Sequence, residues 1–171
     1  MRTISFTVLG KPQPQGSTKA FVVRGRPRIT SDNAKLKPWR QEVGWVALQE
    51  RPTDSIWAGR HEPVHLYATF YIAPPKKLPN GRVMPAVKPD LDKCIRALND
   101  ALTGILWVDD GQVVGVSAKK LYGLPERTEV LLRGLDPVAD EDGAKVESFW
   151  SNEEGKICED VQYPMSPEGH E

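Results

Sequence analysis

The run "VHLYATFYI" at residues 64–72 restricts the fold of this 171-residue chain more than any other stretch. From Val64 to Ile72, aliphatic or phenyl side chains alternate with His, Tyr and Thr at every second position. That period of two is typical of a β-strand with one buried face. Pro74 and Pro75 come just after the run, and the strand is expected to end there because proline removes a backbone donor.

The other periodic segments predict a sheet with helices. Residues 3–9 alternate in the same way, and strands are expected at about 112–119 and 127–135, which would pair as neighbours. A helix is expected from about Asp32 to Glu50, with Ser31 or Asp32 as its N-terminal cap. A second helix is expected from about Leu91 to Gly104, because apolar residues recur there at intervals of three and four.

These elements predict an α/β (α+β) fold, a single compact domain in which a mixed sheet packs against two main helices. The domain is expected to span residues 1–135, whereas residues 136–171 show no sustained period and predict a disordered acidic tail. No apolar run is long enough to cross a membrane, and Cys94 and Cys158 have no C-x-x-C partner. We therefore expect a cytoplasmic protein with reduced thiols and no membrane association.

The formal charge of zero hides a strong division along the chain. Residues 1–135 carry 21 Lys and Arg against 12 Asp and Glu, and residues 136–171 carry 2 against 11. The body is therefore basic, which predicts a polyanionic partner. Residues 10–37 are rich in Gly, Pro and basic residues and predict a loop with a short hairpin arm, which either contacts DNA phosphates or is only a solvated loop. The candidates for DNA contacts are Lys11, Lys19, Arg24, Arg26, Arg28, Lys88, Lys119 and Lys120.

Acidic residues cluster in "KPDLDKCIRALNDALTGILWVDDGQ", residues 88–112, as the pairs Asp90 with Asp92 and Asp109 with Asp110. Two carboxylates about 4 Å apart repel by roughly 1 kcal/mol in water and about 4 kcal/mol near a protein surface, so the clustering needs compensation. Helix capping at Asp90 with a turn at Asp109, neighbouring basic residues, or a divalent cation such as Mg²⁺ would each supply it. The basic body favours the cation, because metal-dependent phosphodiester cleavage needs both bases and carboxylates.

The runs "KPDLDKCIRALNDAL" and "WVDDGQV" resemble the RusA-type Holliday junction resolvases, which are crossover junction endodeoxyribonucleases. The likeness extends more loosely over residues 3–133 and omits the tail. It implies a phosphodiester hydrolase of phage or prophage origin that acts on four-way DNA junctions in recombination and repair. It also implies an α/β homodimer, a Mg²⁺ requirement, and a metal-binding triad of Asp90, Asp92 and Asp110, with Asp109 as a neighbour.

Two positions depart from the family pattern, which has Asn just after the D-L-D and a catalytic Lys three residues later. Lys93 and Arg96 stand there in this chain. Arg96 does not lose its proton, so it would clamp phosphate rather than transfer a proton, and Lys93 would take over part of the charge function. Asp100, ten residues after Asp90, would either support the site from outside the metal ligands or lie on the helix surface near Arg96.

Two other functions fit the same residues. A branched-DNA-binding protein with little or no catalysis would keep the basic surface, and the exchanges at Lys93 and Arg96 would explain the lost chemistry. A nuclease acting on flaps or forks would use the same metal site with a different DNA preference.

Overall fold

The computed structural model describes residues 2–16, 18–23, 25–31, 33–52, 55–77 and 83–135, with the backbone alone at 18–23 and 27–31. The predicted tail at 136–171 lies outside these residues, as does Arg24. No helix among the described residues is long and apolar enough to cross a membrane.

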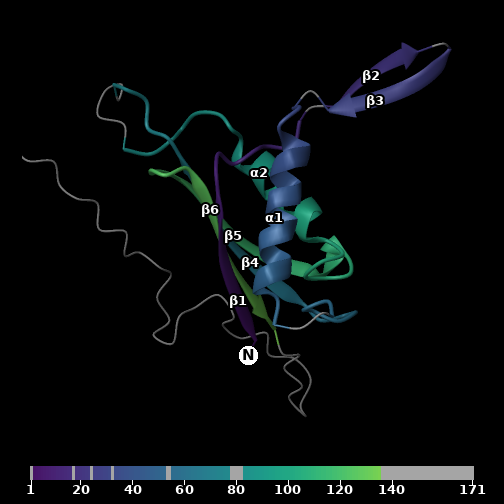
Figure 1. Cartoon of the computed structure of the whole chain (residues 1–171), viewed down its shortest axis with the longest axis vertical. Helices are drawn as coiled ribbons and strands as arrows, with labels where there is room; N and C mark the ends of the chain where they lie inside the picture. The colour runs from purple at the N-terminus through teal and green to yellow at the C-terminus, as the bar shows by residue number, and fades with distance from the viewer. Residues whose placement is uncertain are drawn as a thin grey trace, which may run out of the picture. The chain divides into compact units, whose positions relative to one another are not determined.

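Four strands form one mixed sheet in the order β1-β6-β4-β5 (Figure 1). They are β1 (Thr3–Leu9), β4 (Val64–Ile72), β5 (Val113–Tyr122) and β6 (Arg127–Gly134). β4 runs parallel to β5 and antiparallel to β6, and β1 runs antiparallel to β6. The structure confirms the predicted mixed sheet.

The prediction that the last two strands are neighbours is wrong, because β4 lies between them. β4 is the most deeply buried strand, and the central place gives hydrogen-bonding partners to both of its edges. The four residues 123–126 connect β5 to β6 across the end of β4. This length suffices because two strand spacings amount to only about 10 Å.

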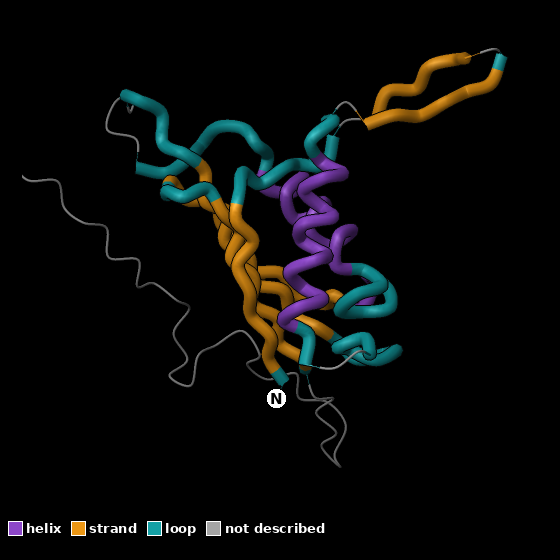
Figure 2. Tube along the Cα trace, viewed as in Figure 1, coloured by secondary structure: helices purple, strands orange, loops and turns teal. Residues whose placement is uncertain are grey.

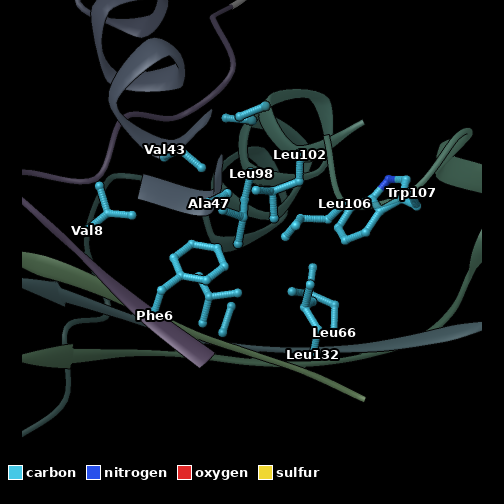
Figure 3. Packing of buried hydrophobic residues seen from close by; sticks show 14 of the residues in the cluster. Phe6, Val8, Val43, Ala47, Leu66, Leu98, Leu102, Leu106, Trp107 and Leu132 are labelled. Atoms are coloured by element: carbon cyan, nitrogen blue, oxygen red, sulfur yellow. The ribbon is translucent and has the colours of Figure 1, made fainter. Parts of the chain in front are cut away.

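Two helices, α1 (Leu36–Glu50) and α2 (Leu91–Leu102), cover one face of the sheet, as predicted (Figure 2). Figure 3 shows Val43 of α1 and Leu98 of α2 in the space above Phe6 and Leu66 of the sheet, and all four are buried. Gly44 allows α1 to approach the segment after α2 closely, since a Cβ at that position would lie 2.9 Å from Cδ1 of Ile105. The core fixes α2, and therefore the acidic residues at its start, relative to the sheet.

The helix ends are partly as predicted. α2 ends at Leu102, and Gly104 follows with a φ of +80°, which suits a helix stop. α1 begins at Leu36 rather than Asp32, and the predicted cap at Ser31 is wrong because Ser31 is the last residue of a strand. The Asn33 side chain instead accepts a hydrogen bond from the backbone N–H of Lys35 at 3.1 Å.

The basic segment at residues 10–37 contains the predicted hairpin. β2 (Thr18–Val23) pairs with β3 (Arg26–Ser31) in a separate antiparallel sheet of two strands. Gly25 lies in the turn with a φ of +74°, a conformation that favours glycine.

Candidate active site at the start of helix α2

Asp90 occupies the N-cap position of α2, but its side chain makes no capping hydrogen bond. Its carboxylate instead forms an ion pair with Lys93, whose Nζ lies 3.0 Å from Oδ2. Capping therefore does not explain the aspartate at this position.

Basic residues keep Asp90 ionised. The hydrogen bond and the charge of Lys93 lower the pKa of the Asp90 carboxyl, and the charges of Lys88 and Lys120 lower it further. Partial burial opposes this effect but does not reverse it. Asp90 is thus an anion at neutral pH, the form that a metal ion or a cationic group requires.

The exposed face of α2 continues the site. Asp92, Arg96 and Asp100 follow one another at intervals of four residues, and all three are exposed. Arg96 therefore stands one helical turn beyond Asp92 on the same side. An exposed guanidinium at that place can bind a phosphate that approaches the two aspartates.

Asp100 forms its ion pair with a residue other than Arg96, the neighbour that the sequence suggested. Its carboxylate forms an ion pair with Arg40 of α1, and not with Arg96. The same guanidinium of Arg40 donates to Oε1 of Gln15 at 2.5 Å. Arg40 of α1 therefore links α2, through Asp100, to the segment before the hairpin, through Gln15.

The basic hairpin is rooted beside the first turn of α2. The backbone N–H of Gln15 donates to the carbonyl of Lys93 at 2.9 Å, and Nδ2 of Asn33 donates to the carbonyl of Pro14 at 2.9 Å. Residues 14–15 and 33 flank the hairpin in sequence. The segment with most of the predicted DNA-contacting residues therefore leaves the body next to Asp90 and Asp92.

Lys11 and Lys88 are exposed and line one cavity, of about 290 Å³, beside Pro89. Arg26 is exposed at the start of β3, and only the backbone of Lys19 and Arg28 is described. Lys11 and Lys88 thus lie near the acidic end of α2.

The two adjacent lysines of β5 point to opposite sides of the sheet. Lys119 is exposed and lines a broad shallow cavity on the face that carries no helix. Lys120 lies on the helix side, and its Nζ donates to the carbonyls of Val87 and Pro89, both at 2.7 Å. Lys120 is therefore part of the surroundings of Asp90.

The second acidic pair forms a short 3₁₀ turn at Asp110–Gln112, before β5. Oδ1 of Asp109 accepts a hydrogen bond from the N–H of Gly111 at 2.8 Å, whereas Asp110 is exposed. Gln112 donates to the carbonyls of Gly59 and Glu62 and accepts from the backbone N–H groups of Val108 and Asp109. Gln112 thereby fixes the turn to the loop before β4, so the glutamine of the D-D-x-Q-V motif is a structural residue.

The two acidic pairs do not meet within one chain. Gln112 precedes β5 and Lys120 lies near its end, so eight residues of extended strand, about 26 Å, separate the two sites. Within the described ranges, no group of three or more His, Cys, Asp or Glu could hold one metal ion. Asp90 and Asp92 are together, while Asp110 lies at the opposite end of β5.

The sequence analysis did not predict a functional role for Arg40 or Gln15. Arg40 lies 60 positions from Asp100, and no period or motif links the two. Gln112 did lie in a recognised motif, but only the structure assigns its role.

Comparison with known proteins identifies the family of this chain. The family model described as endodeoxyribonuclease RusA matches residues 10–133, which include the hairpin, both helices and both acidic pairs. A protein of Bacillus subtilis (strain 168), described as the uncharacterized protein YqaN, is 34% identical over 143 residues. That alignment covers 78% of this chain and 97% of the relative. The chain belongs to the RusA family of endodeoxyribonucleases.

Proposed function

We propose that this protein is a Mg²⁺-dependent endodeoxyribonuclease that resolves Holliday junctions in DNA recombination and repair. The phage or prophage origin implied by the resemblance belongs to the same proposal. The observation that carries it is the ionised, uncapped Asp90 beside Asp92, with Arg96 one turn away and the root of a basic hairpin alongside.

The acidic end of α2 suits a hard divalent cation. Mg²⁺ binds through one or two carboxylates together with water and substrate phosphate, and Asp90 and Asp92 supply such oxygens. Lys93 would have to leave Asp90, which is a small rearrangement because the pair is exposed to solvent. A bound ion would activate water and offset phosphate charge, while Arg96 would hold the phosphate and Lys11 and Lys88 the adjoining backbone.

Asp110 would join this site from a second copy of the chain. β5 is the edge strand of the described sheet, and its side chains Val114 and Val116 are 58% and 40% exposed. Antiparallel pairing of two β5 strands about a two-fold axis near Val116 would set residue 112 of one chain opposite residue 120 of the other. The partner's Asp110 would then lie near Asp90 and Asp92.

A homodimer also suits the substrate. A four-way junction has two-fold symmetry and is resolved by two cuts, so a two-fold dimer offers one site for each cut. Within the residues that the structure describes, one edge of β5 has no neighbouring strand. This edge and the separated acidic residues support the assembly independently of the family resemblance.

The branched-DNA-binding alternative has one observation in its favour, the occupation of Asp90 by Lys93. If that ion pair persisted on DNA, it would exclude a cation from Asp90, and the protein would bind junctions without cutting them.

Cleavage of a synthetic four-way junction in Mg²⁺ tests the proposal. We expect Asp92→Asn to slow cutting at least about 100-fold with unchanged junction binding, because the amide keeps the shape but loses the charge. Glu42→Gln, an exposed carboxylate on α1, serves as the matched control and should cut normally. Undiminished cutting by Asp92→Asn would remove Asp92 from the mechanism.

Three DNA substrates separate the remaining alternatives. Faster cutting of a fork or flap than of the junction would favour the broader nuclease. Tight junction binding by the wild type without any nick in Mg²⁺ or Mn²⁺ would favour the non-catalytic protein.

A further inference from the structure

We propose that Lys120 positions the acidic pair by anchoring the backbone that leads into α2, rather than by contacting DNA. This inference rests on the proposed function, because it assigns a role within the same site. The key observation is the pair of 2.7 Å hydrogen bonds from Nζ of Lys120 to the carbonyls of Val87 and Pro89.

These two bonds fix the residues directly before Asp90. Within the described part of the segment, residues 83–90 belong to no helix or strand, so no ladder of backbone hydrogen bonds holds them. An ammonium group has three donors, and here two of them bind carbonyls that lie two residues apart. The path of the chain into α2 is therefore set by a side chain from β5.

The position of Lys120 on β5 explains how its side chain reaches the backbone before α2. It pairs with Phe70 of β4, which is fully buried beneath the helices, so the lysine points to the helix side of the sheet. Its charge acts on Asp90 and also on the buried Cys94 in the first turn of α2. The ammonium thus lies between β5 and the start of the helix.

Lys120 and Lys93 influence Asp90 in different ways. Lys93 forms a direct ion pair with the carboxylate and would compete with an incoming cation. Lys120 is bound to uncharged carbonyls, so it contributes positive charge near Asp90 without occupying its oxygens. It can remain in place during a catalytic cycle.

Lys119 provides a matched control from the neighbouring position. It carries the same charge on the same strand but is exposed on the opposite face. Replacing either lysine by methionine removes one charge and keeps most of the apolar stem. A difference between the two variants therefore reports on position and not on net charge.

The experiment measures junction cleavage as a function of Mg²⁺ and of junction concentration for Lys120→Met and Lys119→Met. We expect Lys120→Met to raise the half-saturating Mg²⁺ concentration about tenfold or more, with KM for the junction within about twofold of wild type. Lys119→Met should leave the Mg²⁺ dependence unchanged. An unchanged Mg²⁺ dependence in Lys120→Met with a raised KM would overturn the proposal and make Lys120 a DNA contact.

Hydrogen exchange supplies a readout that does not depend on activity. The amides of residues 83–95 should exchange faster in Lys120→Met than in wild type, and those of Lys119→Met should not. If the wild type cuts no DNA, the proposed function fails while this comparison still tests the anchor. Equal exchange in wild type and Lys120→Met would refute the anchor itself. Should Lys120→Met not fold, Lys120→Gln, which keeps a shorter donor, carries the same measurements.

Discussion

Two heterodimers test whether each active site combines residues of two chains. Within one chain, Gln112 before β5 and Lys120 near the end of β5 are about 26 Å apart, so Asp110 is too far from Asp92 to share a metal ion. In the proposed dimer, each site takes Asp90 and Asp92 from one chain and Asp110 from the other. Mixed dimers of variant chains therefore distinguish this arrangement from one in which each chain holds a complete site.

The first heterodimer joins an Asp92→Asn chain to an Asp110→Asn chain. One of its sites loses both residues, and the other keeps all of them, because the intact Asp92 and the intact Asp110 come from opposite chains. We expect about half of the wild-type nicking rate, although each variant alone is inactive as a homodimer.

The second heterodimer joins a wild-type chain to a chain that carries both substitutions. Each site then lacks one aspartate, so we expect almost no nicking. If each chain held a complete site, the two outcomes would be exchanged: no activity for the first heterodimer and about half for the second.

The assay uses differently tagged chains, co-expressed and purified through both tags. Single nicks in a labelled junction are counted on a denaturing gel, because resolution needs two cuts and a one-site dimer supplies only one. No activity in the first heterodimer, together with about half in the second, would refute the composite site.

Two further predictions concern the surroundings of the site. Arg40→Met should destabilise the fold by about 1 kcal/mol and raise KM for the junction more than kcat falls, because the ion pair with Asp100 and the bond to Gln15 hold the hairpin root. Thermal unfolding and steady-state kinetics measure this, with exposed Lys37→Met as the control, and an unchanged KM would contradict it. Burial raises the pKa of Cys94 to about 12, from 9.0. At pH 9 only about one native thiol in a thousand is then ionised, so a Cys158→Ser chain should resist alkylation until it is denatured. The folded state keeps this proton while the unfolded state releases it, so stability should fall as the pH rises from about 9 toward 12. Rapid labelling of the folded chain at pH 9 would contradict this.

The elements that the sequence predicted correctly are those with a local cause. The alternation from Val64 to Ile72 and the helical spacing from Leu91 to Leu102 each specify one buried face, and both elements occur where expected. The order of strands has no such local cause, because it depends on which strand pairs with a neighbour at each of its two edges. For this reason the predicted pairing of the last two strands was wrong.

The same distinction holds for the candidate site. The D-L-D motif placed Asp90 and Asp92 at a helix start, since three residues at the beginning of a periodic segment share one neighbourhood. The motif could not show that Asp90 leaves the helix uncapped, because that choice depends on the competing Lys93. Nor could it show that strand β5 separates Asp110 from the pair, since sequence spacing does not give the direction of a strand.

The three lysines around Asp90 offset the charge of that carboxylate without a bound cation. Lys93 neutralises Asp90 directly, whereas Lys120 and the exposed Lys88 act through charge at a greater distance. A divalent cation carries twice the charge of an ammonium group and binds carboxylate oxygens at a shorter distance, so it should replace Lys93. Lys120 should remain in place, because its two hydrogen bonds go to backbone carbonyls and not to the carboxylate that would bind the ion. The released Lys93 would then stand one turn from Arg96, where both could bind the same phosphate.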